Sequence, residues 1–152
     1  MASRVRGMAV SDNGIQVLID TDAFIAWFKP DDLMAPYAEK IFAKIFAEEL
    51  RIAVTSLVVI ETATTLSNRA DHATALKFLA TLTKTDLPVI HITEALQQDA
   101  IALFTQQAKK GTSVVDCANA VVLRHFNIPA IFSFDGFYKR LGFKVLGDET
   151  RQ

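Results

Sequence analysis

Acidic residues stand in or directly after apolar stretches at three places in the chain. Asp20 follows the apolar run 15–19, and Asp135 follows the apolar run 130–134. Glu61 lies in a predicted helix whose residues one turn earlier are apolar, where a solvated helix face would carry polar neighbours. Charged side chains are rarely buried unless they are paired or bind a metal, so these three carboxylates are candidates for chemistry.

A fourth acid, Asp116, has both a structural and a functional explanation. It lies three residues after Ser113, which is the spacing of a helix capping box. Asp20 can likewise cap a short helix over residues 23–28, and the Asp-Gly pair at 135–136 can form a turn. Taken one at a time, these acids leave the structural and the functional explanation equally open.

Taken together, the four acids indicate a site for a hard divalent cation. Unit charges about 4 Å apart repel by about 4 kcal/mol at an effective dielectric constant of 20, so clustered carboxylates need compensation. Protonation of one carboxyl group is one form of compensation. A set of oxygen ligands without nearby histidine or cysteine is what Mg²⁺ or Mn²⁺ prefers, and we therefore expect a metal site.

Alternating strand and helix patterns predict how these acids are positioned. Strands separated by helices favour a mainly parallel sheet of four to five strands with helices on both faces, and ligands bind beyond the carboxyl ends of such strands. We expect the strands at 51–54 and 144–146 to be less buried than the others. The predicted strands cover 15–19, 51–54, 89–92, 130–134 and 144–146, and the predicted helices cover 23–28, 37–50, 57–68, 72–82, 95–110 and 114–126.

Residues that begin or end helices support these boundaries. Side chains that can accept a hydrogen bond from the first helical turn precede four of the helices, and residues that tolerate positive φ follow two of them. The expected N-caps are Thr55, Asp71, Thr93 and Ser113, and the expected left-handed residues are Gly111 and Asn127.

The composition fits one α/β domain over residues 15–147, preceded by a leader at 1–14 and followed by a tail at 148–152. A chain of 152 residues buries roughly 70% of its unfolded surface. Its net charge of −1 excludes neither nucleic acids nor small anions as ligands. The single Cys117 cannot form an internal disulfide, which favours the cytoplasm, and no apolar run reaches the ~18 residues of a membrane helix.

Four motifs carry the acids in a definite order along the chain: VLIDTDAFIAWF from Val17, TSLVVIETATTL from Thr55, SVVDCANAVV from Ser113 and IFSFDGFYKRLGFKVL from Ile131. In this order and spacing, over about residues 17–146, they resemble the PIN-domain ribonucleases, and among these the VapC-type toxins of bacterial toxin–antitoxin pairs. The resemblance implies a three-layer α/β/α sandwich.

The same resemblance implies which residues form the site. Asp20, Glu61, Asp116 and Asp135 would form the acidic centre, and Asp20, Asp116 and Asp135 would hold one or two Mg²⁺ or Mn²⁺ ions. Family members often carry a small polar residue where this chain has Asp22, which adds negative charge. Asn119, one turn after Asp116, either points into the cleft or is an ordinary surface amide. Supporting roles are expected for Thr21, Asp22, Ser113, Asn119 and Ser133.

The resemblance also implies a reaction and partners. The reaction would be hydrolysis of RNA phosphodiester bonds that leaves a 3′-hydroxyl and a 5′-phosphate, with a protein antitoxin and a second copy of the chain as partners. The apolar helix at 37–50 carries more Phe and Ile than one core face needs, and the excess can serve either partner. The candidate phosphate contacts are Arg69, Lys109, Lys110, Arg124, Lys139 and Arg140.

Two other functions remain open at the level of sequence. The Asp-Thr-Asp after the first strand also resembles phosphatases of the haloacid dehalogenase type, with Asp20 as the nucleophile and Asp22 as the acid/base. Phe24 replaces the usual Thr or Val of that family, and Glu61 would have no role there. The third possibility is a binding module without catalysis.

Overall fold

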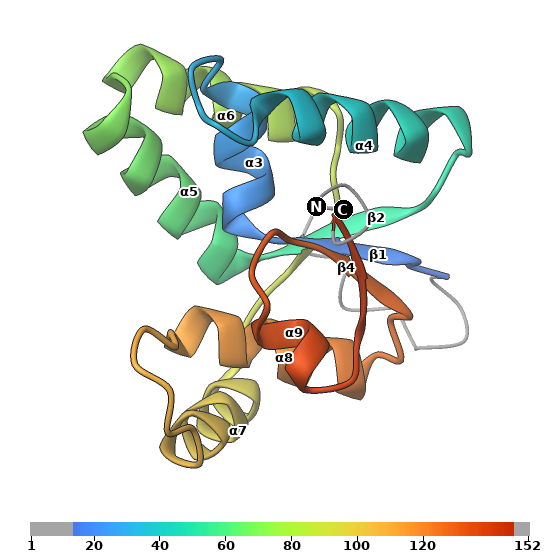
Figure 1. Ribbon diagram of the computed structural model, residues 1–152, viewed down its shortest axis with the longest axis vertical. Helices are drawn as coiled ribbons and strands as arrows, with labels where there is room; N and C mark the ends of the chain where they lie inside the picture. Colours follow the sequence, from blue (N-terminus) through green and yellow to red (C-terminus); the bar gives the residue numbers. More distant parts are fainter. Residues whose placement is uncertain (1–13, 148–152) are drawn as a thin grey trace.

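Five strands form one parallel sheet in the order β3-β2-β1-β4-β5 (Figure 1). The computed structural model describes residues 14–147, so the predicted tail and all of the predicted leader except Gly14 lie outside the described residues. All four neighbouring pairs are parallel, with Leu18 opposite Ala53 on one side and Ile131 on the other. The strands are β1 (Val17–Ile19), β2 (Ile52–Thr55), β3 (Val89–Ile90), β4 (Ala130–Phe132) and β5 (Lys144–Leu146).

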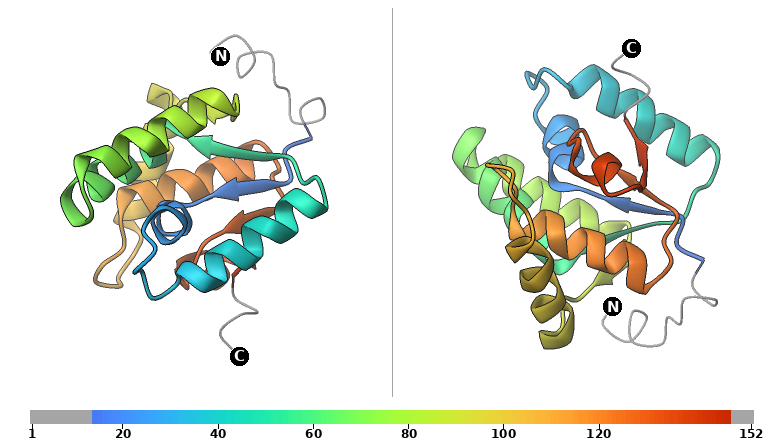
Figure 2. Two further views of the ribbon diagram at one scale, coloured as in Figure 1. Left: turned by 90° about the horizontal axis from the view of Figure 1, so that it is seen from above. Right: turned by 60° about the horizontal axis from the view of Figure 1, so that its bottom comes forward.

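Helices cover both faces of this sheet, which confirms the predicted three-layer sandwich. In Figure 2 (left), β2, β1 and β4 lie side by side with β1 in the middle. The helices on one face are α3 (Thr21–Phe28), α4 (Ala35–Ala47), α5 (Ser56–Arg69) and α6 (His72–Lys84), and those on the other face are α7 (Glu94–Thr105), α8 (Val114–His125) and α9 (Phe137–Arg140).

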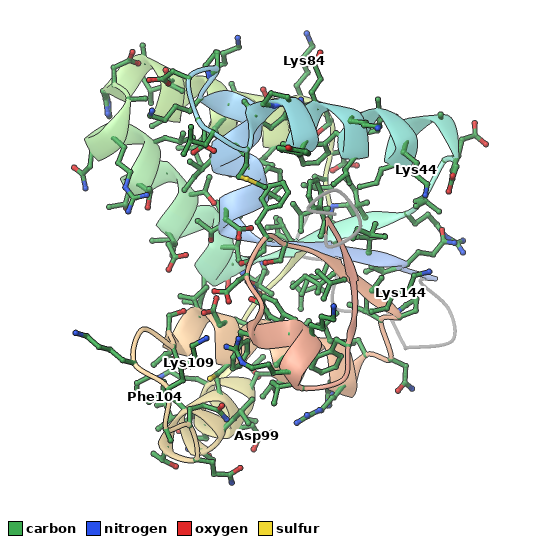
Figure 3. The ribbon with its side chains drawn as sticks, in the orientation of Figure 1. Lys44, Lys84, Asp99, Phe104, Lys109 and Lys144 are labelled. Atoms are coloured by element: carbon green, nitrogen blue, oxygen red, sulfur yellow. The ribbon has the colours of Figure 1, made fainter. Side chains whose placement is uncertain are left out.

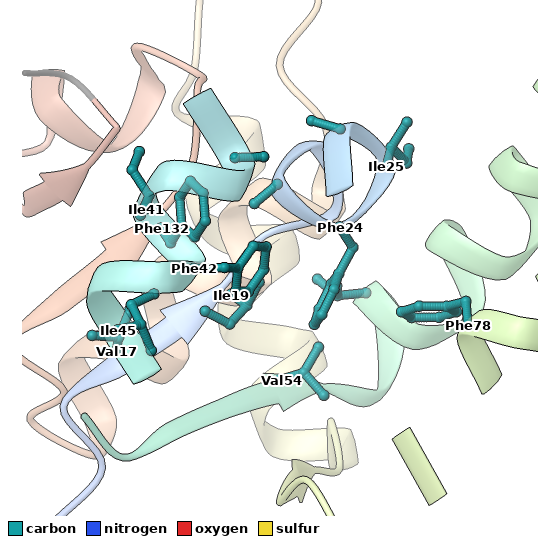
Figure 4. Packing of buried hydrophobic residues seen from close by; sticks show 14 of the residues in the cluster. Val17, Ile19, Phe24, Ile25, Ile41, Phe42, Ile45, Val54, Phe78 and Phe132 are labelled. Atoms are coloured by element: carbon teal, nitrogen blue, oxygen red, sulfur yellow. The ribbon is translucent and has the colours of Figure 1, made fainter. Parts of the chain in front are cut away.

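The two faces of the sheet bury two separate apolar clusters. Val17 and Ile19 of β1 point into the cluster with α3 and α4, while Leu18 between them points into the cluster with α8. Strands buried on both faces consist of continuous apolar runs, which is why β1 and β4 contain no polar residue. Figure 4 shows the first cluster, in which Phe42 of α4 contacts Phe24 of α3 and Phe132 of β4.

The structure corrects the predicted burial of β2. This strand is next to the centre of the sheet, and Ala53, Val54 and Thr55 are fully buried. The sequence of a short apolar strand does not show which strands lie beside it, so the burial of β2 could not be predicted from its own residues. The structure also contains the four-residue α9, for which no helix was predicted.

All four predicted N-caps are present, since the side chains of Thr55, Asp71, Thr93 and Ser113 each accept a bond from the first helical turn. Gly111 and Asn127 have φ of 91° and 49°, as expected for left-handed residues.

Other boundaries differ by a few residues, for physical reasons. The helix predicted over 95–110 ends at Thr105, where the Gln106 N–H donates to the carbonyl of Leu103, three residues back, and the i−4 pattern stops. The strand predicted to reach Ile92 ends at Ile90, and the Ile92 N–H donates to Ser56 Oγ instead of the sheet. His91 is therefore exposed and outside the strand. Among the described residues, no helix is both long and apolar enough to cross a membrane.

Candidate active site

The four predicted acids line one pocket at the carboxyl ends of β1 and β4. The pocket has a volume of about 390 Å³, and most of its lining side chains are polar. Thr21, Asp22 and Ser113, which were expected in supporting roles, line it as well, and Asp22 brings the number of acids in the lining to five. We call it the acidic pocket, and its lining residues are Asp20, Thr21, Asp22, Ile25, Glu61, Thr65, Arg69, Ser113, Asp116 and Asp135.

Asp20 is the most deeply buried of these acids, with 3% of its surface exposed. It ends β1 and caps α3, because its Oδ1 accepts the Thr21 N–H at 2.8 Å. The same oxygen accepts Asn119 Nδ2 at 3.1 Å, and Oδ2 accepts Ser133 Oγ at 2.8 Å. These bonds hold the Asp20 carboxylate in one orientation at the bottom of the pocket.

Asp116 is both a capping residue and a member of the site. Ser113 Oγ accepts the Asp116 N–H at 3.0 Å, and Asp116 Oδ2 accepts the Ser113 N–H at 3.4 Å, which completes a capping box. The box turns the carboxylate toward the pocket, and Tyr138 Oη donates to its Oδ1 at 3.2 Å. The structural and the functional explanation of Asp116 are therefore compatible.

Asp22 connects α3 to the exit of β4. Its Oδ2 accepts the Phe134 N–H at 3.0 Å and lies 3.4 Å from Ser133 Oγ. Ser133 Oγ in turn accepts the Asp135 N–H at 3.0 Å, so Ser133 organises the loop that carries Asp135. Asp22 Oδ1 is buried and has no hydrogen-bond partner among the described residues.

Asp135 and Glu61 reach the pocket from its more open sides. Asp135 is exposed, and its Oδ1 accepts the Phe137 N–H at 2.9 Å, so the predicted turn is present as well. Glu61 is half-buried on α5 and faces the pocket together with Arg69 from the last turn of the same helix.

Burial and the neighbouring carboxylates raise the pKa values of three of the clustered acids, Asp20, Asp22 and Asp116. Burial raises the pKa of Asp20 well above its ordinary value, and the charges of Asp22 and Asp116 raise it further. Burial, with the charge of Asp135 as a smaller cause, raises the pKa of Asp22 to about 7 and that of Asp116 to about 6. The pocket thus favours either protonation or a bound cation at neutral pH.

The donor set fits a hard cation in its chemistry. All the titratable ligands that line the pocket are carboxylates, and one buried carboxylate oxygen lacks a partner. Among the described residues, however, no three His, Cys, Asp or Glu side chains stand as a ready-made metal-binding group. Mg²⁺ usually keeps several waters and takes only one or two carboxylates directly, so this spacing is compatible with partly water-mediated binding.

Comparison with known proteins identifies the family of this fold and site. The family model described as the PIN domain matches residues 17–144, which is most of the chain. This chain belongs to the PIN-domain family.

Individual PIN-domain relatives agree with that assignment. The chain is 25% identical over 127 residues to the 23S rRNA-specific endonuclease VapC20 of two Mycobacterium tuberculosis strains, covering 84% of this chain and 95% of the relative. The crystal structure of M. tuberculosis VapC20, a sarcin-ricin loop cleaving toxin, matches with a TM-score of 0.75 at 24% identity, over 84% of this chain and 96% of that one. The structure of Rickettsia felis VapBC2 bound to a promoter DNA fragment matches with a TM-score of 0.62 at 13% identity, over 86% of this chain and 96% of that one.

Two residues behind the acids of this PIN domain depart from the sequence-based expectations. Asn119 is fully buried and does not line the pocket, so it is neither a surface amide nor a group that points into the cleft. It holds Asp20 from behind. Tyr138 was not predicted at all, although its position three residues after Asp135 matches that of Asn119 after Asp116. This shared spacing is the only signal in the sequence that could have indicated it.

The candidate phosphate contacts of the PIN domain fall into separate groups. Arg69 lines the acidic pocket, and Lys139 lines a small adjoining pocket with Ser133 and Asp135. Arg124 lies over the ring of Phe143 at 5.2 Å and lines a different pocket between α7 and α8. The structure therefore does not bring Arg124 to the acids.

The remaining basic candidates lie outside the lining of the acidic pocket. Lys109 and Lys110 belong to the loop between α7 and α8, and Figure 3 shows Lys109 on the side of the sheet opposite Lys44 and Lys84. Arg140 ends the short helix α9.

Proposed function

We propose that this PIN domain is a metal-dependent endoribonuclease and the toxin of a VapBC-type toxin–antitoxin pair. The observation that supports this most strongly is the convergence of five carboxylates from four separate segments on one pocket at the carboxyl ends of the strands. The similarity to VapC20, which is described as an endonuclease specific for 23S rRNA, supports RNA as the substrate.

The carboxylates have distinct roles in this proposal. Asp20, Asp116 and Asp135 hold one or two Mg²⁺ or Mn²⁺ ions, directly or through water, and Glu61 orients a water from the α5 side. A bound ion supplies a more acidic water and offsets the charge of the phosphodiester. Two bonds keep the exits of β1 and β4 together. Asp22 accepts the Phe134 N–H, and Ser133 Oγ donates to Asp20.

Arg69 is the basic residue best placed to receive a phosphate of the RNA. It lines the acidic pocket from α5, while the other candidates lie outside that lining. A guanidinium group binds phosphate oxygens in a fixed, forked geometry. Arg69 would thus position the RNA backbone beside the carboxylates.

A second, apolar pocket is a candidate site for the antitoxin. Its volume is about 370 Å³, and Trp27 and Phe42 stack within it at a centroid distance of 4.0 Å. An apolar segment of an antitoxin would bury this surface, and the similarity to the fold of VapBC2 supports such a partner. We call it the aromatic groove, and its residues include Phe24, Trp27, Phe28, Phe42, Phe46 and Leu82.

A homodimer and a cytoplasmic location complete the proposal. The exposed Ile60, Ile101 and Phe104 provide apolar surface outside the aromatic groove for a second copy of the chain. The buried free thiol of Cys117 fits a reducing compartment.

The phosphatase alternative is weakened by the position of Glu61. That alternative gives Glu61 no role, whereas Glu61 lines the acidic pocket together with the four aspartates. The non-catalytic alternative leaves five clustered carboxylates without a use.

The proposal is tested by incubating the purified chain with RNA. We expect cleavage when Mg²⁺ or Mn²⁺ is present, none with excess chelator, and no hydrolysis of a phosphomonoester under the same conditions. Phosphomonoester hydrolysis with phosphate trapped on Asp20 would support the phosphatase instead. Metal binding without any cleavage of diverse RNAs would support the binding module.

A further inference from the structure

Two buried polar side chains, Asn119 of α8 and Tyr138 of α9, link Asp20 to Asp116 behind the acidic pocket, and Thr55 at the end of β2 holds Asn119. All three have none of their surface exposed. None of them lines the acidic pocket, so none is placed to touch a substrate or an ion there. Asn119 and Tyr138 must therefore act on the site through the carboxylates that they contact.

The hydrogen bonds of Thr55 determine the orientation of the Asn119 amide. Thr55 Oγ1 accepts the Val58 N–H at 3.3 Å, so its own proton is donated to Asn119 Oδ1 at 3.2 Å. The amide nitrogen of Asn119 then faces Asp20 Oδ1 at 3.1 Å as a donor. The reversed amide would place an oxygen against a carboxylate oxygen, which is unfavourable when Asp20 is charged.

The second amide proton of Asn119 extends the chain of bonds to Asp116. Asn119 Nδ2 donates to Tyr138 Oη at 3.0 Å, and the hydroxyl proton of Tyr138 is then donated to Asp116 Oδ1 at 3.2 Å. One amide group thus contacts Asp20 directly and Asp116 through a single hydroxyl. The hydroxyl protons of Thr55 and Tyr138 and both amide protons of Asn119 therefore each have an acceptor.

Neutral donors suit this position better than cations would. The residues that link the two carboxylates are an asparagine and a tyrosine, and a threonine holds the asparagine. A buried lysine or arginine would satisfy the carboxylates but would compete with a metal for their charge. Neutral hydrogen bonds orient the oxygens and leave that charge in place.

We propose that Tyr138 and Asn119 are positioning residues, which fix the Asp20 and Asp116 carboxylates relative to each other for metal binding. The proposal rests on the metal-dependent function proposed above. Tyr138→Phe removes one oxygen and leaves the ring in its buried site, so packing is retained. It deprives Asp116 of a donor and leaves an Asn119 N–H without an acceptor.

The test is the affinity of the full-length chain for Mn²⁺ alone, measured by isothermal titration calorimetry. We expect Tyr138→Phe to weaken Mn²⁺ binding by roughly 10- to 100-fold, as is typical when a partner of a metal ligand is lost. Tyr37→Phe is the matched control, since it removes the same oxygen from the exposed Tyr37 of α4 and should leave the Mn²⁺ affinity unchanged.

A second variant keeps the test decisive if Tyr138→Phe folds poorly. Asn119→Ser shortens the amide that serves both carboxylates, and it should also weaken Mn²⁺ binding at least about tenfold. In the double variant the two losses should not add, because both break the same chain of bonds.

The outcomes separate this inference from the proposed function. If the unaltered chain binds no Mn²⁺, the metal-dependent function itself is wrong. If it binds Mn²⁺ and both variants bind within twofold of it, the function can stand, but Tyr138 and Asn119 serve only to fill the core.

Discussion

At the scale of residues, four of the five acids are held by a backbone N–H close to them in space. Asp20 accepts from Thr21, Asp22 from Phe134, Asp116 from Ser113 and Asp135 from Phe137. The bonds of Asp20, Asp116 and Asp135 also complete a cap or a turn, whereas the bond of Asp22 joins α3 to the loop after β4. The same residues therefore build the local structure and collect negative charge, which explains why the sequence alone left both explanations open.

Asp135→Asn should separate these two roles. The amide oxygen can still accept the Phe137 N–H, so the turn should survive, while the negative charge is lost. We expect metal-dependent RNA cleavage to fall by at least about 100-fold, since a ligand should matter at least as much as its supporting partners. Thermal unfolding should be unchanged or occur at a higher temperature, because like charges repel less.

The control for that variant is Asp99→Asn, on the exposed surface of α7 and outside the acidic pocket (Figure 3). It should cleave RNA as the unaltered chain does. A loss of activity in both variants, or a folding defect in Asp135→Asn that accounts for its loss, would assign Asp135 a structural role only.

The raised pKa values predict how stability depends on pH. A carboxyl group whose folded pKa is raised stabilises the native state fully below its unfolded pKa, and this contribution is lost as pH rises through the folded pKa. For Asp22 and Asp116 the folded values are about 7 and about 6. The unfolding temperature of the metal-free chain should therefore fall as the pH rises from 5 to 8.

Circular dichroism melts across this range test the prediction, with and without Mn²⁺. The ion should raise the unfolding temperature more at pH 8 than at pH 5, because the carboxylates are then deprotonated. A metal-free chain that becomes steadily more stable from pH 5 to pH 8 would show that these groups are not clustered as described.

At the scale of elements, the periodic apolar patterns predicted most of the helices and strands. The N-caps were identified because their mechanism is local, as in the bond that Thr55 Oγ1 accepts from the Val58 N–H in the first turn of α5. The burial of β2 was missed because it depends on which strands lie beside it. Asn119 and Tyr138 were misplaced or missed for the same reason, since only the packing of α8 and α9 brings them together.

Two phenylalanines of the apolar stripe on α4 differ in burial. Phe42 is 1% exposed and contacts the rings of Phe24, Trp27 and Phe132, whereas Phe46 is 54% exposed. Phe42→Ala should lower the free energy of unfolding by about 3–5 kcal/mol, because it leaves a cavity in the core. Phe46→Ala removes the same atoms from the surface of α4 and should cost far less.

Urea denaturation of both variants measures this difference directly. Comparable losses of unfolding free energy would mean that α4 is not packed on the sheet through Phe42. A larger loss for Phe46 than for Phe42 would reverse the described orientation of the helix.

At the scale of the whole molecule, the sheet order brings the site together. Placing β1 between β2 and β4 puts the exits of three strands side by side, and α8 adds Asp116 from the opposite helix layer. The four motifs predicted this convergence, but the depth of Asp20 and the position of the basic residues required the structure. Arg69 and Arg124 were equivalent candidates in the sequence and lie in different pockets.

That difference predicts how RNA binding responds to the two arginines. Arg69→Gln should weaken RNA binding and reduce the salt dependence of the affinity by about one phosphate contact, because Arg69 lines the acidic pocket. Arg124→Gln removes the same charge at a site where the guanidinium lies over Phe143, and it should change RNA affinity much less. Filter binding at several salt concentrations measures both effects, with both substitutions made in an Asp135→Asn background so that the RNA is not cleaved. Equal losses of RNA affinity in the two variants would show that Arg69 is not the preferred phosphate contact.

In the proposed site, carboxylates from separate segments share a divalent cation in the acidic pocket. Crystals of the chain grown with Mn²⁺ would reveal this cation through its anomalous scattering. We expect an anomalous peak in the pocket, bonded directly or through water to Asp20, Asp116 and Asp135. A well-ordered pocket without such a peak at saturating Mn²⁺, or a peak only elsewhere on the surface, would show that these carboxylates do not share a cation.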